Sequence, residues 1–152
     1  MNCKTFSYLF LSVCLSTGAY AGTGPEKPAS PHPHYRHALS NLRAARWMID
    51  NRPGNWQESV EEVEAVTRID AAVSAIRKAA IDDGKSLHYH PRVKEPKDHG
   101  GRLRSAVAYL KKARVNISLD KDKELVQNLR LRAYEQIDAA LKALRKVIHP
   151  EA

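Results

Sequence analysis

The sequence predicts an all-α protein, an antiparallel up-down-up-down four-helix bundle built from two repeated helical hairpins. Three observations lead to this fold. The second half of the chain repeats the first at a constant offset, four segments carry apolar residues at helical spacing, and no segment alternates apolar and polar residues as a strand does. The runs HALSNLRAAR (37–46) and SAVAYLKKAR (105–114) are counterparts, so the offset is 105 − 37 = 68 residues. Between positions 36 and 78, 14 of 43 residues equal their counterparts, where average composition gives roughly 3.

The first 21 residues have the organisation of a cleaved signal peptide. Lys4 supplies the positive charge, an apolar stretch covers 6–15, and Ala19-Tyr20-Ala21 is an A-x-A cleavage site. The apolar stretch is far shorter than the ~20 residues that span a bilayer. Cleavage near Ala21 would also remove both cysteines, Cys3 and Cys14, so we expect an exported chain without thiols or disulfides.

The first repeat is expected over residues 35–84, after a Pro-rich flexible leader at 22–34. A helix over about 35–50 is followed by a break at 51–55. A second helix over about 56–83 should begin with a capping box of Ser59 and Glu62 and end at Gly84. Its inward residues are predicted to be Val60, Val63, Val66, Ile69, Val73, Ile76 and Ala80.

The second repeat, 102–149, follows a linker at 85–101 and has the same plan. A helix is predicted over about 102–118, and another from an N-cap at Asp120 to about Ile148, where His149-Pro150 stops it. A single hairpin cannot cover its own apolar stripes, whereas two packed hairpins can, either in a monomer or in a swapped dimer of hairpins.

Two further packing features follow from the repeat. Alanines at 71, 72, 75, 139, 140 and 143 should let the two long helices approach closely. Arg46 and Arg114 occupy equivalent positions, and so do Asp70 and Asp138, which are the expected acidic partners of the two arginines.

The histidines provide the main functional prediction. Up-down-up-down order would bring all seven to one end of the bundle: His32, His34, His37, His88, His90, His99 and His149. Imidazole is a ligand for Zn, Cu or Ni, so this end is a candidate site for a divalent transition metal. The alternatives are ordinary loop and helix-end histidines, or an end of the bundle that gains charge in acid.

Charge and missing motifs narrow the other functional classes. The formal net charge is +8, which favours an anionic envelope component as a partner. Nucleic acid is not expected, because the basic residues are not interleaved with stacking aromatics. There is no His-Glu-x-x-His, Gly-x-Ser-x-Gly, Glu-x-x-His or phosphate-cradling glycine loop, and we expect a non-enzyme.

The stretches HPHYRHALSNLRAAR (32–46) and IDAAVSAIRKAAIDDGK (69–85) resemble a group of uncharacterised exported bacterial helical-bundle proteins. The resemblance implies a periplasmic or secreted bacterial setting and no particular reaction. In general shape the chain also resembles small periplasmic metal-binding four-helix proteins, which carry histidine along their helices. Two hypotheses follow: a metal-binding module that uses the histidines, or a structural or protein-interaction module of the envelope without metal.

Overall fold

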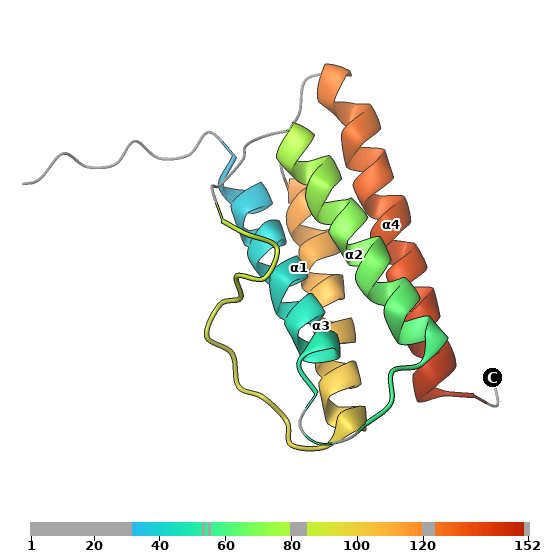
Figure 1. The fold of residues 1–152 in the computed structure, drawn as a ribbon. Helices are drawn as coiled ribbons and strands as arrows, with labels where there is room; N and C mark the ends of the chain where they lie inside the picture. The colour runs from blue at the N-terminus through green and yellow to red at the C-terminus, as the bar shows by residue number, and fades with distance from the viewer. Residues whose placement is uncertain (1–31, 53, 55, 80–84, 120–123, 151–152) are drawn as a thin grey trace, which may run out of the picture.

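The computed structural model describes residues 32–52, 54, 56–79, 85–119 and 124–150. Within these ranges the chain forms four α-helices and no strand, and the helices pack as a bundle (Figure 1). Their bounds are α1 Pro33–Asp50, α2 Val60–Ala79, α3 His99–Leu119 and α4 Glu124–Ile148. The all-α prediction is confirmed.

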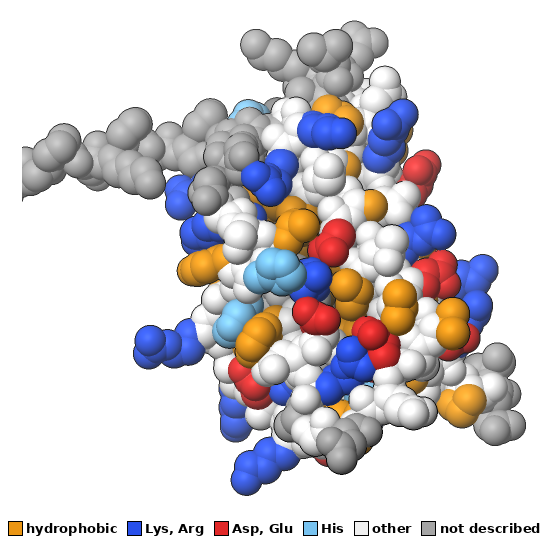
Figure 2. Space-filling model, in the orientation of Figure 1, with side chains coloured by type: hydrophobic (Ala, Val, Ile, Leu, Met, Phe, Trp, Pro, Cys, Tyr) orange, Lys and Arg blue, Asp and Glu red, His pale blue; other side chains and the backbone are white. Residues whose placement is uncertain are grey.

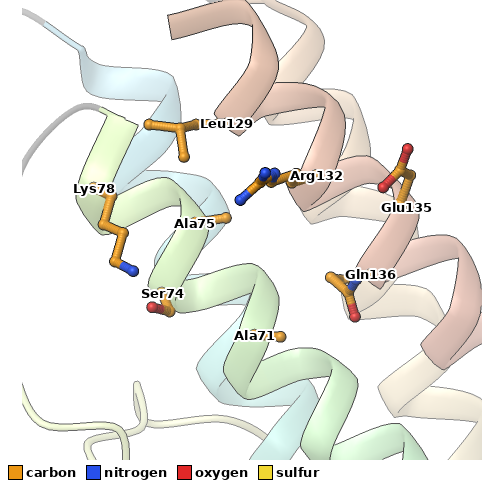
Figure 3. Close-up of a pocket in the computed structure, with 8 residues that line it drawn as sticks. All are labelled: Ala71, Ser74, Ala75, Lys78, Leu129, Arg132, Glu135 and Gln136. Atoms are coloured by element: carbon orange, nitrogen blue, oxygen red, sulfur yellow. The ribbon is translucent and has the colours of Figure 1, made fainter.

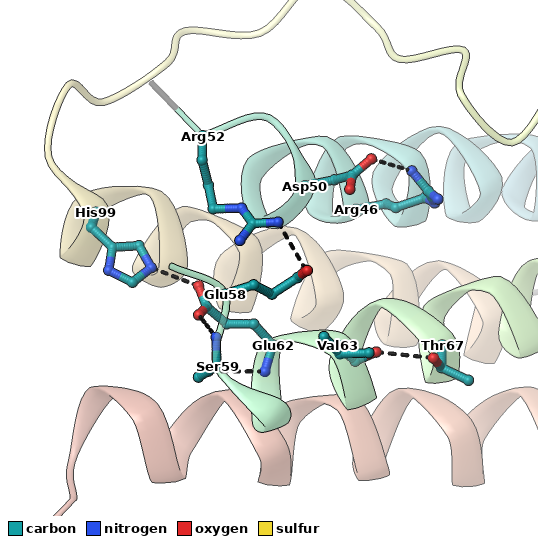
Figure 4. Close-up of polar contacts among 9 residues, drawn as sticks. All are labelled: Arg46, Asp50, Arg52, Glu58, Ser59, Glu62, Val63, Thr67 and His99. Carbon is teal, nitrogen blue, oxygen red and sulfur yellow. Dashed lines mark hydrogen bonds and ion pairs between the residues drawn. The ribbon is translucent and has the colours of Figure 1, made fainter. Parts of the chain in front are cut away.

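The helix starts differ from the expected ones because of local capping. α1 begins two residues early, with Pro33 at its first position, where its missing N–H costs nothing. α2 begins at Val60 instead of 56, since Ser59 is its cap. Ser59 Oγ accepts from Glu62 N–H at 3.2 Å, and Glu62 Oε2 accepts from Ser59 N–H at 2.8 Å (Figure 4). The predicted capping box is therefore confirmed.

The second repeat shows a similar shift. Asp98 Oδ2 accepts from the Gly101 N–H at 2.6 Å, which starts α3 at His99 instead of 102. α4 ends at Ile148, as expected. The predicted N-cap Asp120 and C-terminal Gly84 lie outside the described residues.

The direction of the helices corrects the predicted up-down-up-down order. The end of α1 lies beside the start of α3, as the hydrogen bond of 3.1 Å from Arg102 Nε to the Met48 carbonyl shows. Figure 1 shows α2 ending at the top of the bundle and α3 starting at the bottom. Residues 85–98, which we call the crossover segment, run between these two ends. The order is therefore down-up-up-down, with α1 antiparallel to α3 and α2 antiparallel to α4.

Equivalent helices of the two repeats make the most extensive contacts, α1 with α3 and α2 with α4. Arg68 Nη1 donates to Gln136 Oε1 at 3.4 Å, and these two residues are themselves repeat equivalents. Antiparallel helices that meet at equivalent positions are related by an approximate twofold axis. The two hairpins thus pack as the halves of a symmetric dimer would.

The core consists of the apolar positions that recur in the repeat. All of the following are at most 8% exposed: Ala38 and Ala106, Leu42 and Leu110, Ala45 and Ala113, Ile49 and Ile117, Ala65 and Ala133, Ile69 and Ile137, Ala72 and Ala140, Ala75 and Ala143. The prediction was wrong for the first turn of α2, where Val60 and Val63 are 80% and 48% exposed. Glu62 faces inward there, because it lies on the same side of the helix as the buried Ala65 and Ile69.

No helix among the described residues is long and apolar enough to cross a membrane.

Candidate functional site

The corrected topology separates the histidines that the sequence prediction had grouped. His32, His34 and His37 lie at the start of α1, whereas His99 begins α3 and His149 follows α4 at the opposite end of the bundle. His88 and His90 lie in the crossover segment between the two ends. Figure 2 shows histidine side chains at separate places on this face instead of in one group.

His99 belongs to a polar contact at the start of α2. Its Nε2 lies 2.6 Å from Glu62 Oε1 (Figure 4). Its ring is tilted against Trp56, with 5.0 Å between ring centroids. The Glu62 side chain is 1% exposed. Burial acts to raise the pKa of its carboxyl, but the hydrogen bonds from Ser59 and His99 outweigh burial and lower that pKa below its ordinary value. A buried carboxylate satisfied in this way joins α2 to α3.

His90 anchors the crossover segment to the end of α1. Its ring stacks on Trp47 with centroids 3.7 Å apart and an angle of 11° between the planes. Trp47 Nε1 donates to Glu95 Oε1 at 2.8 Å, and Arg102 Nη1 donates to Glu95 Oε2 at 3.2 Å. These two hydrogen bonds lower the pKa of the Glu95 carboxyl. We call Trp47, His90, Glu95 and Arg102 the crossover clamp.

Arg102 also completes the C-terminus of α1. Its side chain is 2% exposed, and it donates to the carbonyls of Met48 at 3.1 Å and Trp47 at 3.3 Å. The last carbonyls of a helix lack partners within it, and α1 has no basic residue in its last turn. Arg102, from α3, therefore supplies the hydrogen-bond donors that these carbonyls lack within α1. This role of Arg102 was not predicted, although the absence of a basic residue from the last turn of α1 was a usable signal.

The remaining histidines make few contacts within the described part of the chain. His32 lies 5.7 Å from the Tyr35 ring, between centroids. His37 lines a cavity that is described below, and His149 continues α4 through a backbone bond to Arg145 at 2.8 Å. Among the described residues, no group of three or more His, Cys, Asp or Glu side chains could hold a metal ion. The metal site stays a prediction. It was based on all seven histidines lying at one end of the bundle, and the fold does not place them there.

A hollow lies between α2 and α4. It has a volume of about 430 Å³, with Ala71, Ser74 and Ala75 on one side and Leu129, Arg132 and Gln136 on the other (Figure 3). Lys78 and Glu135 complete its lining. The hollow is a shallow groove between two helices, lined by small side chains and by charged side chains of both signs. These side chains are not arranged as a set of converging catalytic groups.

The outer faces of the two hairpins differ in the contacts that they make with the rest of the chain. Four residues define the outer face of α1: Arg36, Ser40, Arg43 and Trp47. The crossover segment lies over two of them, since Arg43 Nη2 donates to the Lys85 carbonyl at 3.1 Å and His90 stacks on Trp47, whereas Arg36 stays exposed. Arg43 is consequently only 1% exposed.

The equivalent residues define the outer face of α3: Arg104, Ala108, Lys111 and Val115. All four are exposed, and no described segment covers them. Val115 is 59% exposed, and Leu119, one turn further, is 54% exposed. Lys111, Lys112 and Val115 line a hollow of about 350 Å³ together with Asn41 and Asn116. Here an apolar surface lies beside lysines, on a helix face whose equivalent in the first repeat contacts the crossover segment.

Comparison of the chain with protein-family models, with curated proteins and with solved structures finds no match. The resemblance of residues 32–46 and 69–85 to exported bacterial helical-bundle proteins therefore stays an expectation.

Proposed function

We propose that this protein is an exported, non-enzymatic interaction module of the bacterial envelope, and that the outer face of α3 binds an acidic, extended segment of a partner protein. One observation carries the proposal. The crossover segment lies over part of the outer face of α1, and the equivalent face of α3 is exposed among the described residues.

The covered face indicates what kind of chain fits the exposed one. On α1 the covering chain has a turn at residues 86–89 and no helix or strand from there to Pro96. Its apolar side chains Leu87 and Val93 pack against the core. It also supplies a carboxylate, Glu95, to the side chains beneath it. A helix face of the same register on α3 can accept a chain of the same form.

Charge favours an acidic occupant. Lys111 and Lys112 are exposed, and neither forms an ion pair within the described residues. Arg114 is half-exposed and pairs with Asp138 at 3.0 Å. A segment with carboxylates would complement the two lysines, while its apolar side chains would cover Val115 and Leu119. The signal peptide expected at 1–21 supports a partner in the envelope.

Site-specific photo-crosslinking in bacterial cells tests this function. A photoreactive residue at Ala108 should give one dominant adduct with a protein, whereas the same residue at Ser40, its equivalent beside the crossover segment, should not give that adduct. Mass spectrometry of the adduct should identify an acidic segment. Lys111→Glu with Lys112→Glu should reduce the adduct at least tenfold, while Lys94→Glu with Lys97→Glu, an equal charge change on the crossover segment, should not.

Three results would contradict the proposal. They are an adduct that is insensitive to charge reversal on α3, an adduct with lipid, and an adduct with a second copy of this chain. Equal labelling from Ala108 and Ser40 would show that exposure of α3 has no consequence for binding.

A further inference from the structure

A second cavity lies between the first turns of α1 and the start of the crossover segment. It has a volume of about 320 Å³, within the range of small-ligand pockets. Arg36, His37, Ser40 and Arg43 line it from α1, and Lys85 and Tyr89 line it from the crossover segment. No acidic side chain is among the described residues of its lining.

The basic groups of this cavity are held in place by the protein. Arg43 is 1% exposed, and its Nη2 donates to the Lys85 carbonyl at 3.1 Å, which holds the guanidinium against the cavity. Lys85 Nζ lies 4.3 Å from the centroid of the Tyr89 ring, in a cation–π contact. Arg36 is exposed at the rim. Three permanent positive charges thus meet around one hollow.

Hydroxyl groups and the helix end suit the same kind of ligand. Ser40 and Tyr89 can each donate a hydrogen bond to an oxyanion. The first turn of α1 contains no acidic residue, so its partial positive charge adds to the field of the basic side chains. Guanidinium and ammonium groups beside hydroxyl donors are the groups that recognise phosphate.

The cavity exists because the crossover segment is present. In the second repeat the equivalents of His37 and Ser40 are Ser105 and Ala108, and no described segment lies over them to form a second wall. The repeat therefore supplies a matched surface with similar basic residues, and the hollow on that surface is lined by residues of α1 and α3 alone. Arg36 and its equivalent Arg104 are both exposed arginines.

We propose that the cavity between α1 and the crossover segment is a binding site for the phosphate group of a phosphate ester, either soluble or in a phospholipid headgroup. The site is independent of the outer face of α3. Arg43 and Lys85 provide the central charges, Arg36 closes the rim, and Ser40 and Tyr89 donate from the sides.

Titration of the purified protein with inorganic phosphate, followed by amide NMR shifts, tests the site. Saturable shifts are expected at Arg36, His37, Ser40 and Tyr89. The double variant Arg36→Ala/Lys85→Ala should bind at least tenfold more weakly. Both side chains are exposed, and the Lys85 carbonyl that holds Arg43 is retained, so the variant should keep its fold.

The charge-matched control is Arg104→Ala/Lys97→Ala, which removes the same two positive charges elsewhere and should bind as the wild type does. A second arm measures sedimentation with phosphatidylglycerol vesicles. Loss of vesicle binding in the first variant alone assigns the site to a headgroup, while saturation by free phosphate alone assigns it to a soluble ester. Equal weakening in both variants, or no saturable binding in either arm, overturns the proposal.

Discussion

Arg46 Nε donates to Asp70 Oδ1 at 2.9 Å, and Arg114 and Asp138, their equivalents in the repeat, form the same contact at 3.0 Å. The two pairs differ in environment, since the Arg46 side chain is 13% exposed and that of Arg114 is 51% exposed. Burial acts to lower the pKa of Arg46, but the hydrogen bond and charge of Asp70, with those of Asp50, outweigh burial and raise it.

This difference predicts unequal effects of the same substitution. Asp70→Asn should lower the free energy of unfolding by about 1 kcal/mol, because it weakens a partly buried charge-assisted hydrogen bond. Asp138→Asn should change it by less than about 0.5 kcal/mol, since exposed pairs are screened by solvent. Urea unfolding at neutral pH measures both. Equal losses would show that exposure does not set the strength of these pairs.

The lowered pKa values of Glu62 and Glu95 predict that the folded protein loses stability in acid. Their folded-state pKa values are lowered, so the stability that they contribute is present above the ordinary carboxyl pKa near 4.5 and is lost as the pH falls through the folded values. Glu62→Gln should cost about 2 kcal/mol at neutral pH, and the difference from wild type should shrink in acid. Unfolding by urea across the acid range measures it.

The control for this experiment is Glu64→Gln, an exposed residue of the same helix whose distance to Arg68 is 3.4 Å. It should cost less than about 0.5 kcal/mol at any pH. A Glu62→Gln effect that did not change with pH would indicate lost packing instead of a lost ionised contact.

The crossover clamp predicts local protection from proteolysis. His90→Ala removes the ring that stacks on Trp47, a contact worth about 1 kcal/mol, and should speed tryptic cleavage after Arg92 and Lys94 about fivefold. His88→Ala is the matched control, because His88 is exposed and has no ring contact within the described residues. Equal cleavage of the two variants would mean that the stack does not hold the segment.

The close packing of α2 and α4 predicts a position-dependent response to a larger side chain. Ala72 is fully buried, so Ala72→Leu should lower the free energy of unfolding by about 1–3 kcal/mol through overpacking. Ala71→Leu, one residue away and exposed, should be nearly neutral. Thermal unfolding of the two variants separates these cases, and similar losses would contradict the packing described for α2.

The separation of the histidines makes a prediction about metal. Zinc should bind no tighter than micromolar, because His34 and His37 lie at the opposite end of the bundle from His99 and His149. Calorimetry of the purified protein measures this. Submicromolar binding that is abolished both by His37→Ala and by His99→Ala would require the two ends to share one ion, which the fold does not allow.

The repeat made the interior of this protein predictable. Apolar residues at helical spacing predicted Ile69, Val73 and Ile76 as core positions, and these three residues are buried. The offset of the repeat predicted both Arg–Asp pairs. These features depend on helical periodicity and on the offset alone. They do not depend on how the hairpins are oriented.

The predicted orientation of the helices was wrong, and the histidine site depended on it. Periodicity is the same for parallel and antiparallel neighbours, so it cannot choose between them. The length of the connection was the available signal. Helix–helix turns in bundles usually have about 2–8 residues, whereas the expected linker covered 85–101. About 14 extended residues span roughly 45 Å, more than the length of α2, so the chain can return to the other end.

The clamp and the buried Glu62 were missed for a different reason. Both join residues that are far apart in sequence, and the corresponding positions of the other repeat carry residues of a different type. Glu62 corresponds to Arg130, and Trp47 corresponds to Val115. A repeat predicts what its two copies share, and these contacts form where the copies differ.

The crossover segment also has a thermodynamic consequence. It is the covalent connection between two hairpins that meet as the halves of a dimer do, so it turns their association into an intramolecular step. Short linkers of this kind supply an effective concentration in the millimolar range. Cleavage within 85–98 would therefore leave a molecule whose stability depends on dilution.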